Sequence, residues 1–283
     1  MVRLTARLAA AAAACLAAGP HAVAAFYLPG VAPRDFEPGE RVEVKVNKLT
    51  SVHTQLPMDY YSMPFCKPKG GVLMQAENLG EFLTGDRIEN SPYKIYMRHD
   101  QACKVLCQEA IDAKHVARLK EAIKREYRHN WIVDNLPAAS IVDSAAYQTT
   151  SYSQGFPVGY EENGHYYLYN HVRLLVDYHP MGDPENPSGR VVGFFAEPFS
   201  VAHRFKAGAK WDGENAEDAP PLETCAADDL QRPIKPGAAP QEVAADAPLL
   251  FTYDVVWQPS QTKWASRWDI YLTMDHAVPN KVR

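Results

Sequence analysis

Alternation of apolar and polar residues with a period of two is the feature that most constrains how this chain folds. It occupies residues 41–48, 165–178 and 249–257, and residues 93–98 show a less regular version. Successive side chains of a β-strand point to opposite faces, so this pattern is typical of strands with one buried face. Turn-forming residues separate the runs. The sequence therefore predicts a mainly β protein with an antiparallel, sandwich-like architecture.

Residues 112–128 follow a helical period instead. Their apolar side chains recur at spacings of three and four, at Val116, Leu119, Ile123 and Tyr127. These positions share one side of a helix, and Asp112 is placed to cap the first turn. The apolar stripe is narrow and lacks Phe and Trp, which favours packing on a sheet over binding to a membrane. We expect one amphipathic helical insertion in the sandwich.

Residues 213–248 are dominated by Ala, Pro, Asp and Glu. This composition predicts a long mobile loop, which is attached at Cys225 if that residue forms a disulfide.

Residues 264–274 are interpreted as a last strand with two opposite faces. One face would carry Trp264, Trp268, Ile270, Leu272 and Met274, and the other Arg267, Asp269 and Thr273. On this interpretation both tryptophans fill the core.

The first residues resemble a secretory signal. Arg3 and Arg7 precede an apolar run at residues 8–18, and small residues follow, with cleavage expected near Ala24 and Ala25. This order is that of a signal peptide, and the run is too short to span a bilayer. We therefore expect a signal peptide at residues 1–25 and a folded domain at residues 26–274. No later run approaches the roughly 20 apolar residues of a membrane span.

Four cysteines remain after the leader: Cys66, Cys103, Cys107 and Cys225. An even number in a secreted chain predicts two disulfides, and the sequence alone allows three pairings. If Cys103 and Cys107 lie on adjacent helical turns, their thiols are side by side, so we expect each to pair with a distant cysteine. A zinc site is disfavoured because Cys66 and Cys225 stand alone and offer no second close pair.

The residues indicate no active centre or cofactor. His165, His171 and His179 lie in one segment, but on one strand the first two would be about 20 Å apart, too far to share a metal. There is no Gly-x-Ser-x-Gly elbow and no glycine-rich phosphate loop. Carboxylate pairs at Glu161–Glu162 and Asp183/Glu185 leave a glycosidase open by composition.

Charge argues against nucleic acid as a partner. The chain has 29 basic and 34 acidic residues, a net charge of −5. Without Arg3 and Arg7 the balance is 27 − 34, or −7. An acidic protein has no electrostatic attraction to a phosphate backbone.

Several blocks, in one order, resemble a known family. Residues 51–66 read SVHTQLPMDYYSMPFC, residues 76–81 read AENLGE, residues 134–137 read DNLP, and residues 263–271 read KWASRWDIY. Together they are similar to the lumenal amino-terminal region of the nonaspanins, the transmembrane 9 superfamily or EMP70 family. The motif residues have no role that can be transferred from the family. They are Tyr60, Tyr61, Pro64, Phe65, Trp264, Arg267, Trp268 and Asp269.

The resemblance implies a non-catalytic recognition or structural module that takes part in sorting membrane proteins through the Golgi and endosomes. Membrane-protein cargo would then be its partner. Exposed aromatic residues would be contact candidates, namely Tyr60, Tyr61, Trp264 and Trp268, although for the two tryptophans we favour the core. On an extended backbone Tyr60 and Tyr61 point oppositely, so at most one is easily buried. The alternative function is a secreted carbohydrate-binding protein or glycosidase.

Nonaspanins continue into nine membrane spans, whereas residues 275–283 depart from the family pattern. We expect an incomplete gene model or, less favoured, a released lumenal domain. The implied location is the secretory pathway: the lumenal side of Golgi or endosomal membranes if the protein is full length, and the lumen or the exterior if the chain is complete.

Overall fold

The computed structural model describes most of the chain beyond its first residues. The described ranges are 32–75, 87–144, 149–183, 185, 187–206, 209, 211–213, 215–231, 233–245 and 247–272. The expected signal peptide with its cleavage site near Ala24 and Ala25, the AENLGE block and residues 275–283 lie outside them. Within the described part, no helix is both long enough and apolar enough to cross a membrane.

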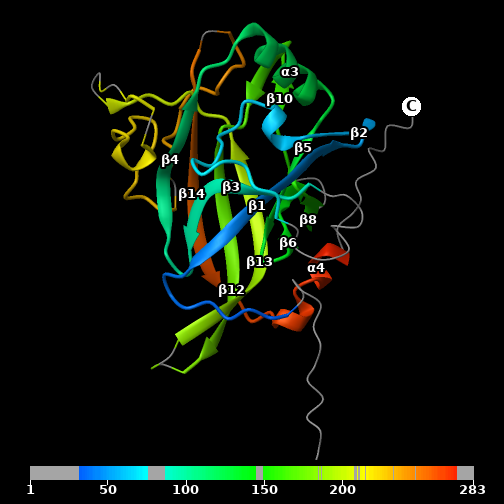
Figure 1. The fold of residues 1–283 in the computed structure, drawn as a ribbon, viewed down its shortest axis with the longest axis vertical. Coiled ribbons are helices and arrows are strands. Elements are labelled where there is room, and N and C mark those ends of the chain that lie inside the picture. Colours follow the sequence, from blue (N-terminus) through cyan, green and yellow to red (C-terminus); the bar gives the residue numbers. More distant parts are fainter. Residues whose placement is uncertain are drawn as a thin grey trace, which may run out of the picture.

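Two six-stranded sheets form the sandwich, confirming the mainly β prediction (Figure 1). The first sheet contains β1 (Arg41–Ser51), β2 (Thr54–Met58), β3 (Glu89–Tyr96), β5 (Arg128–Val133), β6 (Leu136–Pro137) and β9 (Phe156–Pro157). The second has the order β4 (Gln101–Glu109), β14 (Leu249–Pro259), β12 (His171–Gly182), β13 (Pro187–Phe199), β7 (Ala139–Ser144) and β8 (Thr149–Gln154). A hairpin of β10 (Gly159–Glu162) and β11 (His165–Leu168) stands apart from both.

The core lies between the two sheets because each sheet presents an apolar face. On β1 the alternation buries Val42, Val44 and Val46. Aromatic side chains join the layers: the Tyr93 ring of β3 lies 5.2 Å from the Tyr253 ring of β14. Nearly all of β14 is buried, on both faces.

Strand direction differs from the antiparallel prediction at two places. β12 pairs in parallel with β14, and β13 in parallel with β7. The long connection from β13 to β14 returns the chain to the far side of β12, so β14 runs in the direction of β12. Side-chain alternation does not encode strand direction, so the pattern could not reveal this.

The long run at residues 165–178 is two strands, not one. β11 ends at Leu168 and β12 begins at His171. Asn170 causes the break: its buried amide donates to the carbonyls of Val201 and Leu250, and its oxygen accepts from Val201 N–H. These bonds replace a regular strand ladder at that position.

The amphipathic helix is confirmed as α3 (Ala113–Lys124), with Asp112 accepting a hydrogen bond from His115 N–H as its cap. Leu119 and Ile123 are buried, and the helix packs on the β10–β11 hairpin. It ends four residues earlier than predicted, since the chain turns at Glu126 with φ of 53°. Tyr127 is buried all the same, beyond the helix.

The described part of residues 213–248 contains only a short 3₁₀ turn, η3 (Ala216–Asp218). The expected attachment at Cys225 is present; mobility remains a prediction.

Candidate functional site

Two disulfides attach β4 to its surroundings. Cys66 is bonded to Cys107 and Cys103 to Cys225, with Cα–Cα distances of 5.7 and 5.9 Å. The prediction that Cys103 and Cys107 each take a distant partner is confirmed, although its helical argument was wrong because both lie on a strand. The bridges close long loops and stabilise the fold by about 2–4 kcal/mol each.

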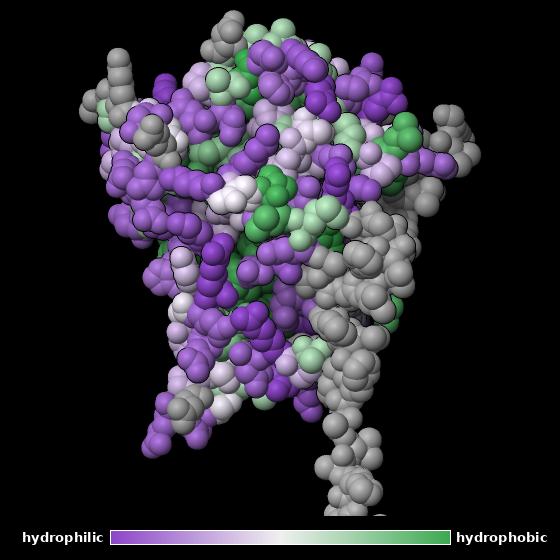
Figure 2. Space-filling view, viewed as in Figure 1, coloured by the Kyte–Doolittle hydropathy of each residue, from purple (hydrophilic) through white to green (hydrophobic). Residues whose placement is uncertain are grey.

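A groove of about 1550 Å³ runs along β4 on one side of the sandwich. All nine residues of β4 line it, with parts of β3 and of segments 67–75 and 213–235. Figure 2 shows hydrophilic residues over the half of this face where β4 and the 213–235 segment lie. Sequence reasoning missed the groove, because its walls come from segments far apart in the chain.

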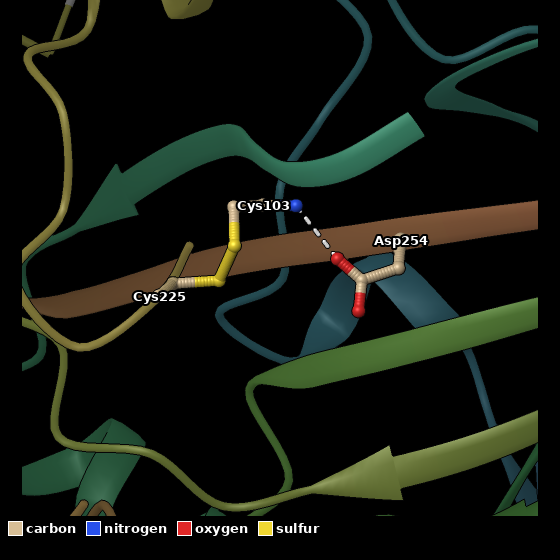
Figure 3. Close-up of side chains that lie close together, drawn as sticks. All are labelled: Cys103, Cys225 and Asp254. Atoms are coloured by element: carbon tan, nitrogen blue, oxygen red, sulfur yellow. Dashed lines mark hydrogen bonds between the residues drawn. A yellow bond between two sulfur atoms is a disulfide. The ribbon is translucent and has the colours of Figure 1, made fainter. Parts of the chain in front are cut away.

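Cys103, Cys225 and Asp254 lie close enough to suggest a metal site (Figure 3). The two sulfur atoms are bonded to each other, however, so they offer no thiolate to a metal while the disulfide is intact. Asp254 instead accepts a hydrogen bond of 2.6 Å from the Cys103 backbone N–H. Its other oxygen lies 2.9 Å from His171 Nε2.

His171 begins a buried chain of hydrogen bonds that we call the histidine relay. His171 Nδ1 lies 2.7 Å from Thr252 Oγ1, and Thr252 Oγ1 lies 2.8 Å from His203 Nε2. His203 Nδ1 lies 2.8 Å from Thr224 Oγ1, so the relay ties the 200–225 segment to the second sheet. Burial, and secondarily His171, lowers the pKa of His203 to about 3.

The three histidines grouped by sequence are held apart in the structure. His165 is exposed beside Glu242, His171 belongs to the relay, and His179 contacts the Ser260 carbonyl. Sequence reasoning missed the relay, although Thr252 and Asp254, two residues apart on an otherwise apolar strand, were a usable signal.

The first motif block builds an aromatic cluster between the sheets. Tyr60 and Tyr61 lie in a 3₁₀ turn, η1 (Tyr60–Ser62), rather than on the extended backbone expected. Tyr60 is buried, while the half-buried Tyr61 donates its hydroxyl to the Asn90 carbonyl. Pro64 and Phe65 are buried too, and the Phe65 ring lies 4.8 Å from Tyr60 and 5.0 Å from His129.

His129 is the polar member of this aromatic cluster. It stacks on Phe156 at 4.6 Å, and burial lowers its pKa to about 3. A cavity of about 20 Å³ lies beside it. His129 Nδ1 and Trp131 Nε1 have no hydrogen-bond partner within the described protein.

The second motif block forms what we call the C-terminal clamp. Arg267 is buried and donates to Asp134 at 2.6 Å and to the Val191 carbonyl at 3.1 Å. Its guanidinium lies 4.6 Å from the centre of the Trp264 ring. The hydroxyl of Tyr271 donates to the Pro137 carbonyl at 2.7 Å. The DNLP and KWASRWDIY blocks, far apart in sequence, therefore meet here.

The clamp overturns the strand predicted for residues 264–272, whereas Thr273 and Met274, the last two residues of that prediction, lie outside the described residues. The clamp consists of a 3₁₀ turn, η4 (Trp264–Ser266), and one helical turn, α4 (Asp269–Leu272). Trp268 is 44% exposed and Trp264 half-buried, so the tryptophans do not fill the core as predicted. Asp269 is exposed, as predicted, whereas Arg267, assigned to the same outer face, is buried. A helical turn rotates successive side chains by about 100°, not 180°, so residues that alternate on a strand do not keep to two opposite faces here.

Comparisons with known proteins agree with the blocks. The sequence model of Endomembrane protein 70 matches residues 57–283. Transmembrane 9 superfamily member 9 of Arabidopsis thaliana is 44% identical, over 90% of this chain and 39% of the relative. Human transmembrane 9 superfamily member 4 is 35% identical, over 88% of this chain and 39% of the relative. Putative phagocytic receptor 1a of Dictyostelium discoideum is 35% identical, over 89% of this chain and 39% of the relative.

The chain thus spans about 39% of the length of these curated relatives. No solved structure matches it. A family model covering residues 57–283, together with relatives of this identity, settles the family. The chain belongs to the Endomembrane protein 70 family, the transmembrane 9 superfamily.

Proposed function

We propose that this chain is the lumenal part of a membrane protein that sorts other membrane proteins through the Golgi and endosomes. In that role it recognises or holds its cargo and performs no catalysis. Membership in a family of endomembrane proteins, one relative of which is named a putative phagocytic receptor, supports this assignment.

The proposal depends on one observation: the described motif residues pack in the core or anchor segments of the fold. Tyr60 and Phe65 pack in the aromatic cluster, and Arg267 is the central ion of the C-terminal clamp. These residues fix the fold and do not converge on one reactive centre. Motif residues used for packing and anchoring suit a domain that presents a surface to a partner.

The positions of the two carboxylate pairs noted in the sequence count against their use as the acid and base of a glycosidase. That mechanism needs two carboxyl groups held across a cleft, about 5–10 Å apart. Glu161 and Glu162 are exposed on the β10 strand of the hairpin, and Asp183 and Glu185 are exposed near the end of β12. Neither pair lines the groove along β4.

The test is recovery of cargo from the secretory pathway. The chain, tagged at its carboxyl end, is expressed through that pathway and cross-linked in intact cells, with a secreted protein of similar size as the control. We expect several-fold enrichment of membrane proteins over the control. Recovery of none above the control would refute cargo recognition.

Catalysis is tested separately, by incubating the purified chain with chromogenic glycosides and with peptide substrates. We expect no turnover. Measurable hydrolysis that survives purification would overturn the non-catalytic part of the proposal.

A further inference from the structure

The second sheet ends in an edge strand that faces the groove. β4 is the first strand in the sheet order and pairs with β14 on one side. In the described part of the chain, no strand pairs with its other side. An edge strand presents a row of backbone N–H and C=O groups to whatever lies beside it. All nine β4 residues line the groove, so the groove extends along the whole strand, and η3 contacts β4 as part of the groove wall.

The size of the groove favours an extended chain over a small molecule. Pockets for small ligands usually enclose about 300–1000 Å³. The volume of about 1550 Å³ exceeds this, and it lies along a strand of nine residues. A peptide segment in β conformation has the length and the backbone groups to fill such a space.

The charge of the groove is opposite to that of the protein. Its basic lining residues are Arg41, Lys67, Lys69, Lys94, Lys104, Lys206 and Lys235. Its acidic lining residues are Glu43, Glu109, Glu217 and Asp228. Seven minus four gives a net of +3, in a chain whose net charge is −5. A basic groove on an acidic protein attracts an acidic ligand and repels a basic one.

Several of these lysines are available to a ligand. Lys94 pairs with Glu217 at 2.9 Å. Lys67, Lys104 and Lys235 are exposed, and none of them forms an ion pair within the described residues. Lys104 lies on β4 itself, and Lys67 directly follows the bridged Cys66, so both are placed beside the strand edge.

The two disulfides fix the walls before a ligand arrives. Cys66–Cys107 holds the segment that carries Lys67 against one part of β4. Cys103–Cys225 holds the 213–235 segment against another. Walls that are already ordered do not have to be ordered on binding, so less of the interaction energy is lost.

We infer that the groove binds an extended acidic segment of a lumenal partner protein, which adds to the free edge of β4 as a further strand. This inference deepens the proposed function, on which it rests, by naming the site and the chemistry of the partner. Backbone hydrogen bonds would supply affinity, and the lysines would select acidic side chains. The competing interpretation is that the lysines only protect the edge from aggregation, as charged residues do on many edge strands.

The first measurement uses an array of random peptides of about ten residues, long enough to pair along β4. The whole chain, produced through the secretory pathway, is applied to the array at physiological salt. We expect the bound peptides to be enriched in Asp and Glu. For the strongest of them, N-methylation of alternate amides should abolish binding in one register and leave it nearly unchanged in the other, because successive amides of a strand point to opposite sides.

The second measurement compares two double variants of matched charge. Lys67→Glu with Lys104→Glu reverses the sign of the net charge of the groove. We expect this double variant to weaken binding of the chosen peptide at least about tenfold. Lys114→Glu with Lys124→Glu makes the same change on exposed positions of α3 and should leave affinity unchanged. Thermal unfolding of both variants verifies that each is folded.

Three results would overturn the inference. The first is that the bound peptides are not enriched in Asp and Glu. The second is that both double variants lose the same affinity for the chosen peptide, and the third is that the chain binds heparin but no peptide. Self-association of the Lys67→Glu/Lys104→Glu variant without peptide binding by the parent chain would establish the protective interpretation instead. If the array fails while membrane proteins are still recovered by cross-linking, the proposed function stands and only the groove assignment is lost.

Discussion

The aromatic cluster and the C-terminal clamp are both built from family motif residues, yet they hold the structure together in different ways. In the aromatic cluster, rings from several elements contact one another, with centroid distances of 4.8 to 5.6 Å between Tyr60, Phe65 and His129. In the clamp, one buried ion pair between Arg267 and Asp134 connects the last described segment to the β5–β6 turn. The first depends on many weak contacts and the second on few strong ones.

This difference predicts different failure modes. Removing one ring from a cluster leaves the others in contact and costs the energy of the cavity that remains. Removing one partner of a buried ion pair leaves the other charge without compensation in a low-dielectric environment. The clamp is therefore the more fragile region under mutation. The aromatic cluster, which contains His129, is the one exposed to changes of pH.

The largest effect is expected from Arg267→Met. The substitution keeps much of the side-chain volume but leaves Asp134, whose side chain is 9% exposed, without its cation. We expect the free energy of unfolding to fall by about 3–5 kcal/mol, as for other broken buried pairs. Urea unfolding measures it.

Arg267→Met with Asp134→Asn is the matched control, and it should recover part of the loss because no unpaired charge remains. An unfolding free energy within about 1 kcal/mol of the parent chain in the single variant would contradict a clamp held by this pair.

The second effect is a loss of stability on acidification. Burial lowers the pKa of both His129 and His203 to about 3, below the ordinary value near 6.5. Between these values the unfolded chain binds protons that the folded chain does not, so stability is complete above about pH 6.5 and falls as pH decreases toward 3. At about pH 5.5 the two histidines together should lower the free energy of unfolding by about 3 kcal/mol.

Urea unfolding at a series of pH values measures this slope. His129→Phe and His203→Gln, separately, should each make it shallower, whereas His99→Gln, a change at an exposed site, should not. Hydrogen exchange should show loosening first in β5 near His129 and last in the clamp, which contains no histidine in residues 264–272. An unfolding free energy that stays constant from about pH 7.5 to 5.5 would refute the buried neutral state of both residues.

The third effect is smaller and tests whether the stability of the clamp comes mainly from the ion pair or equally from its other contacts. Tyr271→Phe removes the hydroxyl that donates to the Pro137 carbonyl, and we expect a loss of about 1 kcal/mol. Arg267→Met should exceed it several-fold if the ion pair dominates. If urea unfolding gives equal losses for Tyr271→Phe and Arg267→Met, the clamp is instead stabilised by many contacts of similar strength, as the aromatic cluster is.

Much of the sandwich could be predicted from local sequence, because burial imposes its period directly on the strands. β1, β14 and α3 were found from alternation, helical spacing and the Asp112 cap. The presence of two disulfides was predicted from the even number of cysteines, whereas their pairing, Cys66 with Cys107 and Cys103 with Cys225, was left open among three possibilities. Strand direction and the break at Asn170 were not predicted, since both depend on hydrogen bonds to segments distant in the chain.

The sites were less predictable than the fold. The groove along β4 and the histidine relay each combine segments that are distant in the chain; in the relay, His203 and Thr224 are 21 residues apart and His171 and Asp254 are 83 apart. A local sequence pattern does not reveal such contacts. At the clamp, Trp264, Trp268 and Ile270 are separated by even numbers of residues, and in so short a segment this spacing fits a strand by chance. Helical turns accommodate the same residues. The burial of Arg267 is explained by its ion pair with Asp134, which is distant in the chain.

The smallest effect separates the two tryptophans of the clamp. Trp268 is 44% exposed and contacts Tyr271, with ring centres 5.3 Å apart, whereas Trp264 lies against the Arg267 guanidinium. Trp268→Ala should therefore cost no more than about 0.5 kcal/mol by urea unfolding. Trp264→Ala should lower the free energy of unfolding by more, because it removes the cation–π contact with Arg267 and opens the ion pair to solvent. A larger loss at Trp268 would mean that the exposed ring, and not Arg267, carries the stability of the clamp.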